Sequence, residues 1–375
     1  MASAHNHPDR IVIHTGAAAG EVDKICSLER IVRRVDDLLT GNNEETLRTA
    51  KEFLIVGRWI YSPDNVDKIE EKFGKLEPQV PLNVDAGSVR TGDLTRSRSQ
   101  SDATSRNDVL QKHELEWNLA VRKIKTVLAK MFELTTLRWE SDLPFSKEIW
   151  PVVNPDISHL SLNVFVPDAE NRDDDHPHPE YFTHDDLKHL TIFRGLESLA
   201  VYGMTESFQS IIWETAWRNN HLHTLELGML LHPITRDGEG KPFPRINKGW
   251  KLVGHPEQKY HGQDGKGMLH HVHGYGEYLD HLCMAHARNT VRSGSATPMN
   301  NFSVKVLVLG NFVVDSTAFQ HFSNLEEIVF VDDCHDAGLS FDKSLRDDIK
   351  LYYRQQGFGF SGKMEMKQVE LAKID

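Results

Sequence analysis

The sequence predicts an α/β fold of repeated strand–helix units, with a parallel sheet on one face and helices on the other. Three observations predict this fold. A short apolar unit, LxxLxΦ with Φ a large apolar residue, recurs across residues 134–330. Helical periodicity fills the gaps between close copies. Three of the five intervals between units have similar lengths, which indicates that each unit buries its apolar face on its neighbours.

Six copies of the unit are expected to form strands. They begin at Leu134, Ile157, Leu196, Leu222, Val304 and Leu325, at intervals of 23, 39, 26, 82 and 21 residues. Three intervals fall within the period of about 20–29 residues that is typical of leucine-rich repeats, and the two longer ones contain polar inserts. The chain is therefore expected to form an irregular leucine-rich-repeat-like solenoid. A seventh match at residues 187–192 lies too close to the next unit and is assigned to a helix.

Helices are expected between the strands and before them. An amphipathic pattern covers residues 110–132, and shorter apolar patterns cover 208–217 and 317–322. A further helix is expected over residues 275–288, with Leu282 among its inward residues.

The chain before residue 75 is expected to be a small helical unit. Apolar residues recur at three- and four-residue steps between residues 22 and 40. A second helix is expected over residues 43–59, and a weaker helical run covers 64–73. Short connections between these runs are consistent with antiparallel neighbours.

Three parts of the chain follow from these patterns. Residues 1–74 form the helical unit, and residues 75–108 are rich in Ser, Thr, Asp and Arg with almost no large apolar side chains. Such a segment cannot offset the entropy lost on ordering, so it is expected to be a disordered linker. Residues 109–375 form the repeat domain, with insertions at 167–181 and 232–300.

The strand ends depart from the regular repeat pattern. The position where a regular repeat places Asn or Cys is occupied here by Asp142, Phe165, Met204, Leu230, Phe312 and Asp333. A regular asparagine ladder is therefore not expected. The turns after the strands must satisfy their backbone groups in another way.

Charge and composition narrow the functional class. The 375 residues contain 43 Lys and Arg against 55 Asp and Glu, for a formal net charge of −12. A binder of nucleic-acid backbones needs a concentrated basic surface, so nucleic acid is not an expected partner. The three cysteines are widely spaced, which excludes a disulfide scaffold and a CxxC zinc module.

No apolar run approaches the length of about 18 residues that a membrane helix needs. No signal peptide is evident, so an intracellular, cytoplasmic or nuclear protein without membrane contact is expected.

Histidine is the unusual residue of this composition, with 21 copies. Eight of them lie near or within the longer insertion: His232, His255, His261, His270, His271, His273, His281 and His286. None shows the i, i+4 spacing or the HExxH pattern of a helical zinc site, so no metal ligand or cofactor is assigned. The alternative that stays open is a His-rich metal-binding protein or metal-dependent hydrolase using residues 232–300.

Nucleophilic catalysis has no support in the sequence. No GxSxG turn is present, and no cysteine has a recognisable histidine partner. A non-enzymatic protein is therefore expected.

The remaining candidate for function is the exposed face of the strands. By period-2 alternation, the residues that flank the central leucine of each unit point away from the core. The expected partner-binding residues on this concave face are Thr136, Arg138, His159, Ser161, Thr224, Glu226, Val306, Val308, Glu327 and Val329. Exposed valines on the late strands would have to be covered by the C-terminal segment or by a partner.

Residues 110–340 resemble a known family. A helix containing Trp117 leads into Leu134-x-x-Leu137-x-Trp139 and Leu143-Pro144-Phe145, and the Leu196 unit, Gly276-Glu277-Tyr278-Leu279-Asp280 and the Leu325 unit follow. This pattern resembles the divergent leucine-rich-repeat region of fungal F-box-like proteins. The resemblance implies a protein–protein interaction module with a substrate-recognition or adaptor role and a ubiquitin-ligase scaffold as a partner. The Leu-Pro-x-Glu-Ile/Leu start of an F-box is not found in the first 60 residues, so the resemblance covers the repeat region alone.

Overall fold

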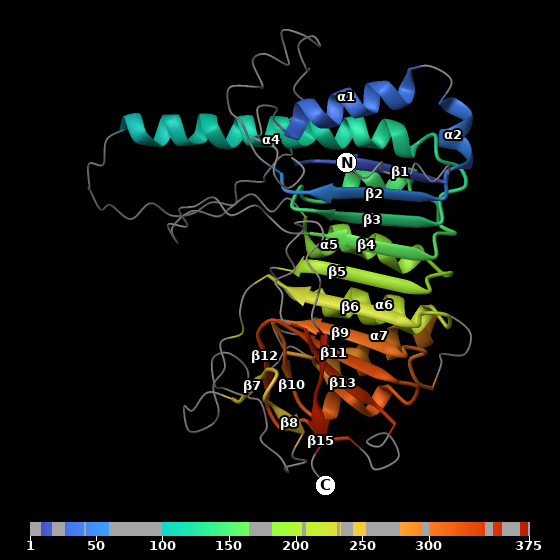
Figure 1. Ribbon diagram of the computed structural model, residues 1–375, viewed down its shortest axis with the longest axis vertical. Coiled ribbons are helices and arrows are strands. Elements are labelled where there is room, and N and C mark those ends of the chain that lie inside the picture. Colours follow the sequence, from blue (N-terminus) through green and yellow to red (C-terminus); the bar gives the residue numbers. More distant parts are fainter. Residues whose placement is uncertain are drawn as a thin grey trace.

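The computed structural model describes residues 9–16, 27–40, 43–59, 100–164, 182–204, 208–230, 233, 243–252, 278–294, 300–341, 348–354 and 368–373. Their main feature is a ten-stranded sheet with helices packed against it (Figure 1). Its strands are β1 (Arg10–His14), β2 (Glu52–Gly57), β3 (Thr136–Ser141), β4 (His159–Asn163), β5 (Ser198–Met204), β6 (Thr224–Met229), β9 (Val306–Gly310), β11 (Glu327–Val331), β13 (Lys350–Arg354) and β14 (Gln368–Glu370).

The remaining elements are helices and two small sheets. The helices are α1 (Ser27–Leu39), α2 (Glu44–Thr49), α4 (Gln100–Leu128), α5 (His184–Leu187), α6 (Gln209–Arg218) and α7 (His281–Gly294). The 3₁₀ helices among the described residues are η1 (Lys147–Val152), η2 (Lys188–Ile192) and η3 (Thr317–His321). The small sheets contain β10 (Val313–Val314), β12 (Cys334–Asp336) and β7 (Arg245–Ile246), and β15 (Ala372–Lys373) with β8 (Lys251–Leu252).

The strands of the main sheet lie side by side in the order in which they occur in the chain. From β1 to β13 every neighbouring pair is parallel, and β14 adds to the edge of β13 as an antiparallel strand. The six predicted LxxLxΦ units form β3, β4, β5, β6, β9 and β11, which confirms the predicted strands and their parallel arrangement. The architecture is a mixed α/β fold around one large, mostly parallel sheet.

A backbone hydrogen-bond ladder holds the beginnings of these strands at one level. The amide of His223 donates to Glu197 O at 2.8 Å, and the amide of Lys305 donates to His223 O at 2.8 Å. Glu326 and Lys350 continue the same pattern, each at 2.8 Å. The ladder passes from β6 to β9 without a step although residues 230–305 lie between these strands, so the long insertion leaves the register unchanged.

The core lies between the sheet and the helices. Figure 1 shows α5, α6 and α7 on one side of the strands. The aligned row nearest the start of the strands on that side consists of Ile11, Phe53, Leu137, Leu160, Leu199, Leu225, Leu307, Ile328 and Leu351, and all of these side chains are buried. Since parallel strands lie about 4.8 Å apart, such a row forms a continuous apolar layer.

Trp217 and Trp139 pack in this core with their indole N–H groups hydrogen-bonded. Trp217 of α6 stacks on Phe302 with 3.9 Å between ring centroids, and its Nε1 donates to Met284 O of α7 at 2.9 Å. Trp139 of β3 packs edge-to-face on Phe145 at 5.1 Å, and its Nε1 donates to the Leu143 carbonyl. Each large ring therefore contributes apolar burial without leaving a polar atom unpaired.

The free edge of β1 lies next to α1. Arg34 of α1 donates its Nε to the Val12 carbonyl at 3.4 Å, and the buried residues of α1 include Ile31 and Val35. An exposed strand edge is a template for aggregation, and a helix that covers it removes part of that template.

Side chains at the carboxyl ends of the strands replace the missing asparagine ladder. Ser141 Oγ donates to Gly57 O at 2.8 Å, and Asn163 Nδ2 donates to Ser141 O at 2.6 Å. Farther along, Asn311 Nδ2 donates to Met229 O at 2.8 Å, and Cys334 Sγ donates to Leu309 O at 3.3 Å. Each bond joins a strand end to the preceding strand of the sheet. The donors occupy shifted positions, which explains why the regular pattern is not visible in the sequence.

The prediction of a purely helical N-terminal unit is wrong. Residues 52–57, which were expected to be helical, form β2, and the helix before them ends at Thr49. Arg10–His14 form β1, so this part of the chain contributes two strands to the main sheet. The reason is tertiary: Phe53 and Ile55 face the core beside Leu137 and Trp139, and this pairing overrides the local pattern. The helical run predicted for 64–73 lies outside the described residues.

Two further predictions need correction. Helix α4 begins at Gln100, so the predicted linker of residues 75–108 overlaps the helix, and its residues 75–99 lie outside the described residues. Helix α7 begins six residues later than predicted, and Leu282 on it is 49% exposed rather than inward-facing. The predicted helices before Leu222 and Leu325 correspond to α6 and η3, and residues 187–192 are helical as expected. The insertion at 167–181 lies outside the described residues.

We expect Asn163→Ala to destabilise the fold by about 1–3 kcal/mol, because it leaves the buried Ser141 carbonyl without its 2.6 Å donor. Urea denaturation followed by circular dichroism measures this change. Ser158→Ala is the matched control, since its hydroxyl makes an equivalent bond to Thr135 O at 3.2 Å on the exposed surface. Equal losses in the two variants would contradict a structural role for the side-chain ladder.

Candidate functional site

The candidate site is the face of the main sheet that points away from the helices, here called the open face (Figure 1). The structure brings all ten predicted partner-binding residues onto this face in two aligned rows. One row contains Thr136, His159, Thr224, Val306 and Glu327, and the other contains Arg138, Ser161, Glu226, Val308 and Val329. The parallel register therefore places side chains from five strands, β3, β4, β6, β9 and β11, together on one face.

A charged network occupies the open face at β1, β2 and β3. Arg10 Nε lies 3.3 Å from Glu52 Oε2, and Arg138 lies 3.8 Å from Glu52 Oε1. Arg138 also pairs with Glu140 Oε1 at 2.5 Å, and the side chain of Arg138 is 42% exposed. Exposed ion pairs of this kind add little to stability, but they fix the direction in which each charge points. Sequence reasoning missed Arg10 and Glu52 because it did not assign strands to these segments.

A tyrosine–glutamate pair continues the polar surface onto β5 and β6. The hydroxyl of Tyr202 donates to Glu226 Oε2. Burial, followed by the charges of Glu226 and Glu140, raises the pKa of Tyr202 well above its usual value, while Arg354 acts in the opposite direction. Tyr202 therefore stays protonated and holds the Glu226 carboxylate in place. The alternation pattern predicts that Tyr202 faces outward, but the sequence unit ends before this residue.

The late valines on this face are covered within the chain. Val308 is 3% exposed and Val329 is 2% exposed, which agrees with the alternative that the chain itself, rather than a partner, covers them. They form a cluster with Val331, and Val306 and Tyr352 pack against it while remaining partly exposed. The accessible part of the open face is therefore polar and lies mainly on β1–β6.

The histidine-rich insertion gives no metal site that the structure describes. Of its eight histidines, His281 and His286 lie on α7, and the other six fall outside the described residues. Within the described ranges, no group of three or more His, Cys, Asp or Glu side chains has an arrangement that could hold a metal ion.

A buried polar cluster joins α7 to α6 and to the segment after β10. Asp280 Oδ1 accepts the amide of Leu282 at 2.8 Å and caps the start of α7. Gln209 Oε1 accepts the Asp280 amide at 3.2 Å, and the hydroxyl of Tyr278 donates to Asp315 Oδ2. Asp280 is 1% exposed, so a substrate cannot reach it, and its contacts are those of a structural cap.

The two described cysteines are poor nucleophiles. Both Cys283 and Cys334 are buried. Burial is the main cause that raises the pKa of each thiol, to about 12 for Cys334. Since the thiolate is the reactive form, neither side chain has the environment of a catalytic cysteine.

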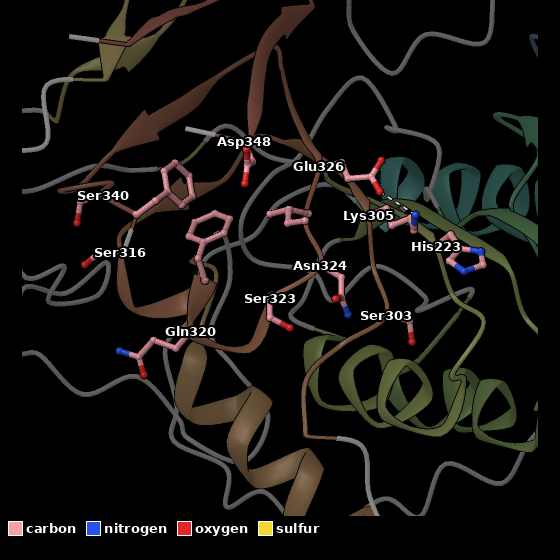
Figure 2. Close-up of a pocket in the computed structure, with 13 residues that line it drawn as sticks. His223, Ser303, Lys305, Ser316, Gln320, Ser323, Asn324, Glu326, Ser340 and Asp348 are labelled. Atoms are coloured by element: carbon pink, nitrogen blue, oxygen red, sulfur yellow. Dashed lines mark hydrogen bonds and ion pairs between the residues drawn. The ribbon is translucent and has the colours of Figure 1, made fainter. Parts of the chain in front are cut away.

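A second surface feature is a groove of about 990 Å³ at the amino-terminal edge of the sheet (Figure 2). Residues that precede β6, β9, β11 and β13 line it together with η3 and the segment after β12. Figure 2 shows the Lys305–Glu326 ion pair beside His223, with Asp348 on the far side of Glu326. No pattern in the sequence indicates this groove, because its walls come from segments that are distant in the chain.

Helix α4 is the longest described helix, with 29 residues. Charged residues such as Arg122, Lys123 and Lys125 interrupt its apolar positions. Within the described part of the chain, no helix combines the length and the apolar character needed to cross a bilayer.

We expect Asp280→Asn to change how stability depends on pH. Burial is the largest cause that raises the pKa of Asp280 above 3.8, and the charge of Asp315 adds to it. The folded state then binds the proton more tightly than the unfolded state, so the contribution of Asp280 is full below its unfolded pKa and falls as pH rises through its folded pKa. The asparagine keeps an oxygen for the cap without the charge. In thermal denaturation, the melting temperature of the variant should therefore increase relative to that of the natural chain as pH rises from about 3.5 to about 7.

Asp185→Asn is the matched control for this measurement. The hydrogen bond and charge of Lys188 lower the pKa of Asp185, so the contribution of Asp185 is lost as pH falls. The melting temperature of the Asp185→Asn variant should therefore decrease relative to that of the natural chain as pH rises. A stability difference for Asp280→Asn that does not change with pH would contradict the raised pKa.

Neither protein-family models nor curated proteins give a match to this chain. The residues of the open face and of the groove are therefore the observations on which a function has to rest.

Proposed function

We propose that this chain is a non-enzymatic protein-interaction module whose open face binds another protein. The observation that carries the proposal is the polar surface on neighbouring strands of one face, where Arg10, Glu52, Arg138 and Glu140 form ion pairs and Glu226 accepts from Tyr202. Charges of both signs at fixed positions give a surface that selects a partner by electrostatic complementarity.

The proposed architecture behind this face is an irregular leucine-rich-repeat-like solenoid. Three observations support it: strand order follows chain order, neighbouring strands are aligned, and side chains at the strand ends bond to the preceding strand. In a solenoid each repeat contacts its neighbours, and the face formed by the strands is a common binding surface. The step from a solenoid fold to a binding role for its strand face is an analogy. The charged side chains of the open face make this role specific to the present chain.

The chemistry of the face indicates what the partner presents. Arg10 and Arg138 offer guanidinium groups on β1 and β3, and the exposed surface of Glu226 lies on β6. We infer that the partner places a carboxylate near Arg138 and a basic side chain near Glu226. Ion pairs at an accessible face mainly set orientation and rate of association, so high salt is expected to weaken the complex.

The resemblance to fungal F-box-like proteins extends the proposal to a substrate-recognition or adaptor role. Such a role needs two partners, a substrate on the open face and a ubiquitin-ligase scaffold elsewhere on the chain. Recovery of a cullin adaptor together with a second protein would support this part of the proposal, and recovery of the second protein alone would restrict the role to binding.

We expect Arg138→Glu and Glu226→Lys to abolish capture of the partner in affinity purification from the native source with mass spectrometry. Each change reverses a charge on the open face without altering a residue of the apolar core. Arg33→Glu is the control, because Arg33 pairs with Glu29 on the surface of α1, away from the sheet.

Circular dichroism of every variant separates loss of binding from loss of folding. Arg138→Glu creates a third carboxylate beside Glu52 and Glu140, so Arg138→Ala is included as a variant that removes the charge without adding repulsion. A partner recovered equally by the folded natural chain and by the folded open-face variants would show that binding does not use this face.

A further inference from the structure

The groove at the amino-terminal edge of the sheet has a regular wall. His223, Lys305 and Glu326 precede β6, β9 and β11 by one residue each, and backbone bonds of 2.8 Å join them in that order. Asp348 lies two residues before β13. Since neighbouring strands are about 4.8 Å apart, the row from His223 to Asp348 is about 14 Å long. An extended peptide of about four residues has this length.

The charges of the wall are unequal. Lys305 Nζ lies 2.7 Å from Glu326 Oε1, so the positive charge of the lysine and the negative charge of the glutamate largely cancel. Lys305 holds the pKa of Glu326 below its usual value, so the pair stays ionised at neutral pH. Asp348 is exposed, and among the described residues it has no hydrogen bond or ion pair. Within the part of the chain that the structure describes, Asp348 is therefore the one carboxylate of this groove without an ion-pair partner.

The rest of the lining is aromatic and hydroxyl-rich. Phe341 is partly exposed and meets the buried ring of Phe319 edge-to-face at 5.1 Å. Ser316, Ser323 and Ser340 add hydroxyl groups that both donate and accept hydrogen bonds. An aromatic ring and a carboxylate in one groove are the two groups that bind a guanidinium or an ammonium ion.

We propose that this groove binds an extended peptide segment of a partner protein through an arginine or lysine side chain. The basic group pairs with Asp348 and packs on Phe341, and the serine hydroxyls bond to the peptide backbone. An anion is disfavoured, because the one lysine of the lining is held by Glu326. The groove is separate from the open face, so this inference does not depend on the binding proposed for that face.

Fluorescence anisotropy with the full chain tests the proposal. The probe is a fluorescein-labelled peptide, Gly-Ser-Arg-Ser-Gly, and the comparison peptides carry Gln or Glu in place of Arg. We expect the Arg peptide to bind about tenfold more tightly than the Gln peptide, since a charge-assisted hydrogen bond is worth roughly that ratio. Higher salt should reduce the difference.

Two substitutions locate the site. Asp348→Asn should abolish most of the preference for Arg over Gln, and Phe341→Leu should weaken binding of the Arg peptide while retaining an apolar side chain. Glu133→Gln is the matched control, because it removes a carboxylate from an exposed turn after α4. Arg138→Glu on the open face should also leave peptide binding unchanged.

Several outcomes would overturn the proposal. Equal binding of the Arg and Gln peptides, or an unchanged preference in a folded Asp348→Asn variant, would show that the carboxylate does not recognise a basic group. Binding of a neutral oligosaccharide in place of every peptide would assign the hydroxyl-rich groove to carbohydrate. Circular dichroism and the melting temperature confirm that each variant is folded before its binding is compared.

Discussion

The alignment of the parallel strands is the constraint on which the rest of the structure depends. A backbone ladder at the amino-terminal edge starts the strands at one level, from Lys51 beside β2 to Lys350 in β13. Because side chains alternate along a strand, a shift of one residue would exchange the buried and exposed faces of a whole repeat. The ladder continues directly from β6 to β9 although a long segment of chain lies between these two strands. The sheet therefore accommodates this insertion without a change of register.

The same register creates both candidate sites. On the open face it places Glu52, Arg138 and Glu140 where their charges meet, although the two strands that carry them are separated by about eighty residues of chain. At the amino-terminal ends of the strands it places Lys305 beside Glu326, while Asp348 has no ion pair among the described residues. One site is a surface of paired charges, and the other is a groove whose lining includes Phe319 and Phe341.

Local patterns were sufficient for some elements and not for others. The six LxxLxΦ units identified strands because their apolar residues are both regular and buried, as Leu160 and Leu307 illustrate. The same reasoning failed for the short apolar run that begins at Phe53. The leucine, isoleucine and valine that follow it in the chain are compatible with helix as well as with strand. Helical spacing predicts an inward Leu282, yet this side chain is 49% exposed while its neighbours Cys283 and Met284 are buried. Charged residues in β1 and β2 were missed for the same reason as the strands themselves.

The sequence by itself determined the class of fold, the six central strands and the outward direction of residues such as Arg138 and Glu226, because alternation within one strand is a local property. Tertiary structure decided which residues from different repeats meet. It buried Val308 and Val329, replaced the asparagine ladder with Ser141, Asn163, Asn311 and Cys334, and brought Asp348 to the wall of the groove. These outcomes depend on contacts between segments far apart in the chain, and no pattern within one segment contains them.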